Sequence, residues 1–470
     1  MASIARALAR IKDDVRAFVT DESIERAARD AGHRWRERLL GPVETVHLFV
    51  LQVIHSNTAI RHLRHLAGRA VNAAAYCEAR KRLPLAALRS LVRDSAAAAA
   101  ARPGAAARPG AAARPGAAAR PGAAAAGAGW CGWCGLRVLL VDGSSTIAPD
   151  TPASQRAFGQ PSNQKAGCGL PVPKVLALFD AFTGMVLEAL CLPLCTHEQS
   201  GVWRLHPALG PGDLLVGDRG FCSYVHLAML HARGVFGLFR MHQRQIVDFR
   251  PGRRPRRKGE RGRPRSRVVR RLGRHDQVVA WPRPGRRPKW MAMLAAQFES
   301  LPAELHVREL RYHLKGRGRR TRVVTIATTL LDPALYPAEK VAELYGVRWS
   351  AETHFAELKT TLRMRRVKSQ TPDGVRKELA VYCLVYNLVR AVMARAAARQ
   401  GTTPDRVSFT DALRWLLCAA APGQDVAALV INPRREGRHE PRVIKNLRDN
   451  YRKMTLPRAQ MRRRLDLAKR

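Results

Sequence analysis

Four polar residues in one helical segment constrain the fold of this chain most strongly. Tyr345, Arg348, Glu352 and Lys359 follow one another along the segment from Ala338 onward. On an α-helix, which turns by about 100° per residue, their side chains fall within an arc of about 60°. The apolar residues form a neighbouring stripe, which consists of Leu344, Val347, Ala351, Phe355, Leu358 and Leu362. The pattern predicts a helix whose charged face lies beside its buried face, whereas a merely solvated face more often lies opposite.

Charge indicates the kind of partner. The 470 residues include 82 Lys and Arg against 37 Asp and Glu, which gives a net charge of +45. Of these cations 68 are Arg, whose planar fork matches the oxygens of a phosphate. A GC-rich coding bias explains the preference for Arg over Lys but not the excess of cations. The balance therefore favours a nucleic-acid partner.

The sequence gives no sign of a membrane or of an oxidising compartment. The segment Met1–Asp14 alternates charged and small apolar residues, and no uninterrupted apolar stretch approaches about 18 residues. The nine cysteines are scattered without a regular framework. We therefore expect a cytoplasmic protein with reduced thiols and no membrane partner.

Cysteine spacing leaves two weaker alternatives open. Cys131 and Cys134 have thioredoxin-like spacing, but such a redox site needs a strand before it and a helix after it. Here a low-complexity tract precedes the pair and a strand is predicted to follow. A zinc site would need further ligands, for which Cys191, Cys195 and His197 are the candidates.

Two carboxylates occupy equivalent places at the ends of predicted strands. Asp142 follows the apolar run Val138–Val141, and Asp218 follows the run 214–216 and a glycine. A strand end fixes a carboxylate at the edge of a sheet, although Asp-Gly after a strand is also an ordinary turn. Two such Asp and a Glu from a covering helix could hold two divalent cations about 3.5–4 Å apart. The hard oxygen ligands suit Mg²⁺.

Further strands are expected at 175–179 and 185–192, which form a hairpin, and at 235–239, 268–269, 278–281, 290–294 and 323–330.

Together these residues resemble the motifs of a known protein family. Tyr345-x2-Arg348-x3-Glu352-x6-Lys359 resembles the signature of the insertion-sequence-four family of bacterial DDE transposases. The segments 141–144 with 149–151, 217–221, 328–330 with 344–349, and 76–84 also resemble family segments. The resemblance covers about residues 50–95 and 136–420.

The resemblance implies an α/β fold. Its catalytic domain is expected to be RNase H-like, a mixed five-stranded sheet with helices, interrupted by a β-rich insertion and preceded by an N-terminal helical DNA-binding region. The expected organisation is 1–95 for the helical region, 96–135 for an Ala/Arg/Pro/Gly linker, 136–243 for the first part of the core, 244–321 for the basic insertion, 322–420 for the second part, and 421–470 for a basic tail. The linker repeats Arg-Pro-Gly-Ala-Ala-Ala, which cannot continue a helix. It is either a basic tether or, as we favour, a slippage expansion in a tolerant loop.

The resemblance also assigns roles to residues. Asp142, Asp218 and Glu352 are expected to be the catalytic ligands of two Mg²⁺ ions, for which Mn²⁺ can substitute. Arg348 and Lys359 are expected to contact phosphates at the transposon end, with Tyr345 assisting. Two further DNA contacts are expected from Trp349, which could stack on a displaced base or simply pack in the core, and from Arg219.

The expected activity is that of an insertion-sequence transposase in the bacterial cytoplasm, at the nucleoid. It would bind double-stranded DNA at terminal inverted repeats, cleave it and transfer the strand to target DNA, and a homodimer would synapse the two ends. Two alternatives from other classes stay open. One is a DNA-binding protein without catalysis, and the other is an RNase H-like nuclease that cuts without joining.

Overall fold

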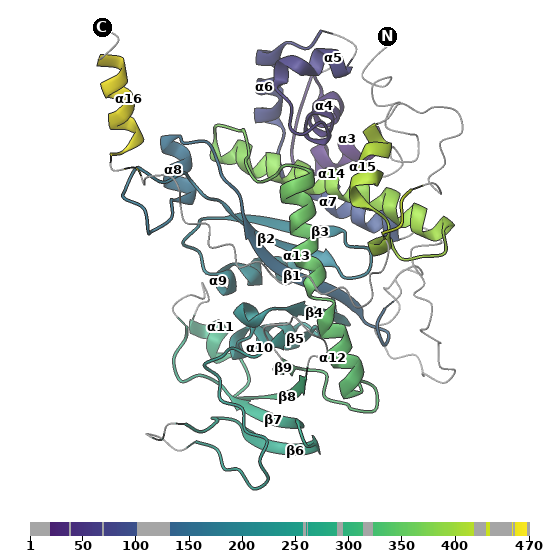
Figure 1. Cartoon of the computed structure of the whole chain (residues 1–470), viewed down its shortest axis with the longest axis vertical. Coiled ribbons are helices and arrows are strands. Elements are labelled where there is room, and N and C mark those ends of the chain that lie inside the picture. The colour runs from purple at the N-terminus through teal and green to yellow at the C-terminus, as the bar shows by residue number, and fades with distance from the viewer. Residues whose placement is uncertain are drawn as a thin grey trace.

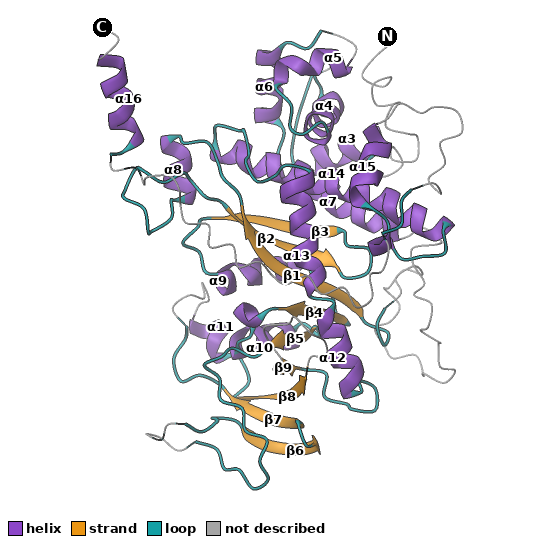
Figure 2. Cartoon of the chain, viewed as in Figure 1, coloured by secondary structure: helices purple, strands orange, loops and turns teal. Residues whose placement is uncertain are grey.

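The computed structural model describes residues 19–36, 39–67, 70–100, 132–256, 260, 262–288, 295–313, 323–417, 429–432, 454 and 456–467. Within them, one sheet of nine strands runs through the molecule in the order β3-β2-β1-β4-β5-β9-β8-β7-β6 (Figure 2). The strands are β1 (Arg137–Ser145), β2 (Lys174–Asp180), β3 (Val186–Leu192), β4 (Asp213–Gly217), β5 (Phe236–Arg240), β6 (Arg267–Gly273), β7 (Asp276–Pro282), β8 (Glu304–His313) and β9 (Val323–Thr328). The architecture is therefore mixed α/β, as the sequence predicts.

The first five strands form one half of this sheet. β1 pairs antiparallel with β2 and parallel with β4, and β4 pairs parallel with β5. In the β1–β4 pair, Val141 lies opposite Gly217. The next residues are Asp142 and Asp218, which are therefore neighbours. The prediction that Asp142 follows the end of its strand is wrong, because β1 continues to Ser145 and Asp142 lies opposite Ala177 of β2, whereas Asp218 does follow the end of β4. The predicted hairpin is confirmed as β2 and β3, joined through a turn at Gly184.

The other half of the sheet is an antiparallel meander. β9 pairs with β5 on one side and with β8 on the other, and β7 and β6 follow (Figure 1). Strand β8 was not predicted, because it carries charges inside the fold. Arg308 and Glu309 are 1% exposed, and Arg308 donates to Asp276 of β7 at 2.8 Å. The strand expected at 290–294 lies outside the described residues.

Helices cover the sheet and build a separate layer above it (Figure 1). The α-helices are α3 (Asp21–Asp30), α4 (Pro42–Ile54), α5 (Leu63–Ala67), α6 (Ala73–Arg82), α7 (Leu85–Ala100), α8 (Pro152–Phe158), α9 (Glu198–Val202), α10 (Tyr224–Ala232), α11 (Ala295–Glu299), α12 (Ala338–Gly346), α13 (Trp349–Ala356), α14 (Pro372–Arg399), α15 (Phe409–Leu417) and α16 (Arg458–Leu467). Short 3₁₀ turns are η1 (Ile60–His62), η3 (Trp203–Ala208), η4 (Arg219–Phe221) and η6 (Pro404–Arg406), and η5 (Glu357–Thr361) is a π-helical turn.

Helix α14 is the central element of the helical layer. It packs against α7, α4, α15 and strand β3. Its length and apolar composition would also suit a membrane span, but 89% of its apolar window is buried inside the protein. That burial is the environment of a core helix.

The C-terminal helix α16 stands away from the body (Figure 1). Its first residue, Arg458, donates its backbone N–H to Gly167 O at 3.2 Å. Arg458 and Arg462 also approach Asp150 at 3.9 and 3.8 Å. The predicted basic tail thus contains a helix within its described part.

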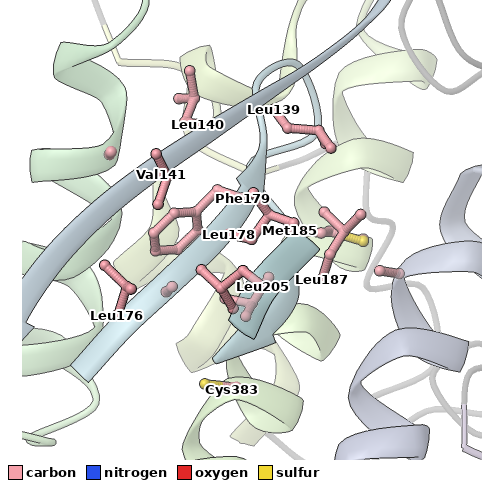
Figure 3. Close-up of a cluster of buried hydrophobic side chains, with 14 of the residues drawn as sticks. Leu139, Leu140, Val141, Leu176, Leu178, Phe179, Met185, Leu187, Leu205 and Cys383 are labelled. Atoms are coloured by element: carbon pink, nitrogen blue, oxygen red, sulfur yellow. The ribbon is translucent and has the colours of Figure 1, made fainter. Parts of the chain in front are cut away.

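A buried apolar cluster joins the sheet to the helices (Figure 3). Phe179 of β2 is 0% exposed, and its ring lies 5.3 Å from that of Phe355 in α13 and 6.5 Å from that of Tyr386 in α14, both edge-on. Such aromatic contacts add to the hydrophobic gain of burial. They fix α13 on the sheet. Other members of the cluster are Leu139, Leu140, Val141, Leu176, Leu178, Met185, Leu187, Leu205 and Cys383.

The sequence predicts that the polar stripe lies on one uninterrupted α-helix, and this prediction is wrong. Tyr345 is in α12, Arg348 precedes α13, and Lys359 is in the π-helical turn η5. Between α12 and α13 the N–H groups of Val347 and Arg348 donate three residues back, to Leu344 and Tyr345. This tightening and the later π turn, which widens the helix, rotate the stripe away from ideal periodicity.

Candidate active site

Asp142 and Asp218 form the centre of the candidate site. Asp142 lies in the second half of β1, and Asp218 directly follows β4. Both side chains are half-buried. The Oδ1 atom of Asp142 accepts the N–H of Gly143 at 2.8 Å, and Oδ1 of Asp218 accepts the N–H of Gly220 at 2.7 Å. Each carboxylate is thereby oriented through one oxygen. Within the described residues, no hydrogen bond engages the second oxygen of either.

The surroundings of Asp142 disfavour its negative charge. Burial raises its pKa to about 6, and the charges of Asp218 and Glu198 act in the same direction. The N–H of Gly143 and the cation of Arg348 lower it, but they do not outweigh the burial. A carboxyl group whose pKa is raised by burial, with other carboxylates beside it, is a common feature of functional sites.

Arg348 lies between Asp142 and Glu352. Its guanidinium donates to Glu352 Oε1 at 2.9 Å and also lowers the pKa of Asp142. The Arg348 side chain is only 12% exposed, whereas that of Glu352 is 52% exposed. The structure thus connects Glu352 with Asp142 only through the intervening cation of Arg348. The sequence predicts instead that the three carboxylates converge within metal-bridging reach. In this conformation Glu352 is paired with Arg348.

The other members of the stripe take different positions. Lys359 donates to Ser144 Oγ at 3.2 Å and so reaches strand β1 two residues beyond Asp142. Burial and the neighbouring Arg365 lower the pKa of Lys359. Tyr345 is 1% exposed, and its hydroxyl has no hydrogen-bond partner within the described residues. Burial raises its pKa well above its ordinary value.

Trp349 and Arg219 lie at the rim of this arrangement. The Trp349 ring is half-buried, edge-on to Tyr345 at 6.5 Å, with Arg348 Cζ 5.1 Å from the ring centroid. Arg219 is exposed and donates to Gln243 Oε1 at 2.9 Å. Stacking on a base and contact with DNA stay predictions for these two residues.

Sequence reasoning missed one carboxylate of the site, Glu198. It is the first residue of α9, after β3, and it contributes to the raised pKa of Asp142. Burial, followed by the charge of Asp218, raises the pKa of Glu198 itself. No spacing rule connects Glu198 with either Asp, because only the fold brings α9 to the ends of β1 and β4. The sequence feature that could have indicated a further side chain here is the pair of glycines, Gly143 and Gly220, which follow Asp142 and Asp218 by one and two residues.

The donor atoms of the site suit a hard cation. Its centre consists of carboxylate oxygens, and one oxygen of each Asp is not committed to a hydrogen bond. Among the described residues, no three His, Cys, Asp or Glu side chains stand close enough to form a finished metal cage. Cys134, Cys191, Cys195 and His197 belong to no such group among the described residues, and Cys131 lies outside them.

Comparison with known proteins gives the family. Residues 133–388 match the model of the transposase DDE domain, a segment that contains both Asp and the whole polar stripe. A relative is the transposase InsG for insertion sequence element IS4 of Escherichia coli (strain K12), which is 28% identical over 332 residues and covers 67% of this chain and 68% of its own. A solved structure of a piggyBac transposase synaptic complex with hairpin DNA matches over 86% of this chain and 78% of that chain, with 12% identity and a TM-score of 0.37. The family match and the relative show that the chain belongs to the DDE transposases of the IS4 family.

Proposed function

We propose that the protein binds the terminal inverted repeats of its insertion sequence, cleaves the DNA there and transfers the strand to target DNA. Asp142, Asp218 and Glu352 are the catalytic residues of this proposal. The observation that carries it is the pairing of Val141 with Gly217 in parallel strands, because it makes Asp142 and Asp218, the next residues of the two strands, neighbours. The strand order β3-β2-β1-β4-β5 supports an RNase H-like core.

The three carboxylates would hold two Mg²⁺ ions, and Mn²⁺ can substitute. When bound, such ions activate a water or a 3′ hydroxyl and stabilise the leaving oxygen of a phosphoryl transfer. Asp142 presents its oxygens from within β1, and Asp218 from the residue that follows β4. Glu352 reaches the site from α13 once Arg348 exchanges its carboxylate partner for a phosphate of the DNA.

The cations of the stripe bind the DNA backbone in this proposal. Arg348 is mostly buried, so its fork is pre-oriented, and a bidentate contact with phosphate gains from that rigidity. Lys359 is held at β1 by Ser144 and neutralises a second phosphate. Tyr345 supports Arg348 and Trp349, because its buried ring packs beside them.

The remaining parts of the chain serve recognition and assembly. The N-terminal helices and the basic insertion bind double-stranded DNA, and the net charge of +45 makes that binding strongly salt-dependent. A homodimer synapses the two transposon ends, in the bacterial cytoplasm.

Glu352→Gln tests the proposal. The substitution keeps the side-chain size and a partner for Arg348 but removes the ligand charge. We expect Mg²⁺-dependent cleavage of an inverted-repeat substrate to fall by at least about a hundredfold, with binding of the same DNA unchanged in EDTA. Retained cleavage would refute the assignment of Glu352. Cleavage by the unaltered protein without joined products would indicate a nuclease.

A further inference from the structure

We propose that Glu198 is a fourth carboxylate of the active site and shares a divalent cation with Asp218. The inference rests on the proposed function and adds a residue to it. Glu198 lies outside the three-carboxylate set that the sequence predicts. It reaches the site from α9, a short helix between β3 and β4 that contacts β2 and η4.

Two glycines make room for the Glu198 carboxylate. A Cβ atom on Gly143 would lie 2.5 Å from Glu198 Oε1, and one on Gly220 would lie 3.3 Å from Oε2. Cβ atoms essentially never approach an oxygen as closely as the first of these distances. The carboxylate therefore occupies the space that side chains at these two positions would fill, directly after Asp142 and beside Asp218.

The same geometry limits the separation of the carboxylates. The Cβ position of Gly220 is 2.9 Å from Asp218 Oδ1 and 3.3 Å from Glu198 Oε2. The two oxygens are no further apart than these distances added together. Like charges at such a separation repel, and a divalent cation between them removes the repulsion.

Among the described residues, Glu198 forms no hydrogen bond or ion pair that would explain its place. The charges of Lys174 and His197 lower its pKa, but Lys174 donates to Thr196 O at 2.7 Å and not to Glu198. A half-buried carboxylate without a partner costs free energy, so a structural role would normally provide one.

Packing fixes the helix that carries Glu198. A Cβ atom on Gly201 would lie 2.5 Å from Leu192 Cδ1, so α9 approaches β3 as closely as a glycine allows. Trp203 Nε1 donates to Ser200 O at 2.9 Å and closes the following turn. The position of Glu198 is thus defined by the fold.

Glu198→Gln is the direct test, with Mn²⁺ as the probe and no DNA present. The amide keeps the volume between the glycines and removes the charge. We expect the dissociation constant of Mn²⁺, measured by electron paramagnetic resonance of the free ion, to rise on the order of tenfold. The control Glu339→Gln, on the exposed start of α12, should bind Mn²⁺ like the unaltered protein. Equal affinity of Glu198→Gln and the control would overturn the inference.

Gly143→Ala provides a second test that does not alter Glu198. The added methyl group should displace the carboxylate and weaken Mn²⁺ binding by a similar factor. In a Glu198→Ala background the same methyl group meets no carboxylate, so it should have no further effect. If Gly143→Ala weakens binding equally in both backgrounds, the methyl group acts on Asp142 and the inference is wrong.

Asp218→Asn separates this inference from the proposed function. Loss of Mn²⁺ binding and cleavage in Asp218→Asn, with unchanged behaviour of Glu198→Gln, would leave the function intact and remove Glu198 from the site. Retained cleavage in Asp218→Asn would refute the proposed function itself.

Discussion

At the scale of single residues, Asp142 is a carboxyl group of the site whose ionisation destabilises the folded protein. Its pKa is raised from 3.8 to about 6, chiefly by burial. In the unfolded chain this carboxyl ionises near pH 4, whereas in the folded protein it stays protonated up to about pH 6. The folded state therefore binds more protons in this window, and stability falls as the pH rises through it. Above pH 6 the ionised Asp142 destabilises the fold.

Asp142→Asn should consequently stabilise the protein at neutral pH. The amide oxygen can still accept the N–H of Gly143, while the buried charge is gone. We expect a gain of about 1–2 kcal/mol at pH 7.5 in EDTA, reduced for partial solvent screening, which disappears toward pH 4. Urea unfolding at several pH values measures it. A gain that is independent of pH, or equal in Glu339→Gln, would contradict the explanation.

At the scale of elements, the sequence predicted the composition of the site better than its geometry. The strands beside Asp142 and Asp218 were predicted because short apolar runs and the following glycines are local signals, although β1 continues past Asp142 to Ser145. The apolar face of the helix was also predicted, and Leu344, Ala351 and Phe355 are at most 5% exposed. The tightened turn before α13 and the π turn were not predictable, because they depend on contacts with α14 and β1.

Tyr386 of α14 holds the π turn in place. Its hydroxyl donates to Glu357 Oε2 at 2.9 Å and lies 3.0 Å from His354 Nδ1, all inside the protein. Removing the hydroxyl leaves Glu357 and His354 without this contact. Glu357 lies two residues before Lys359, and His354 lies two residues after Glu352. Tyr386→Phe should therefore cost about 1–3 kcal/mol and weaken cleavage beyond the loss of folded protein.

Tyr382→Phe is the matched control for this change. Tyr382 is equally buried on the same helix, but its hydroxyl bond to Arg363 O is long, at 3.4 Å. Its loss in urea unfolding should be clearly smaller. Equal losses for the two variants would show that Tyr386 contributes by packing alone.

At the scale of the whole molecule, one continuous sheet links the catalytic half to the insertion. β9 joins the halves by pairing with both β5 and β8. The sequence predicted an insertion but treated β9 as part of the core alone. Pairing between strands far apart in the chain leaves no local signal. The strand at 278–281 was predicted and is β7, but the charged residues of β8, among them Arg308 in its buried pair with Asp276, concealed that strand.

The N-terminal helices are attached to the core through Glu378 of α14, which is 1% exposed. Its carboxylate accepts Asn57 Nδ2 at 2.6 Å and the N–H groups of Lys368 and Ser369 at 2.8 Å each. Glu378→Ala would leave the buried Asn57 amide and the N–H groups of Lys368 and Ser369 without this acceptor, so we expect a loss of about 3 kcal/mol. Because Asn57 follows α4, hydrogen exchange should accelerate first in residues 42–54 and 73–82, while the strands β7 and β8 keep their protection.

Glu339→Ala, at an exposed site, should change neither region. A uniform loss of protection in Glu378→Ala would instead mean that the helical layer and the sheet unfold as one unit, and that the N-terminal helices cannot move independently when they bind DNA.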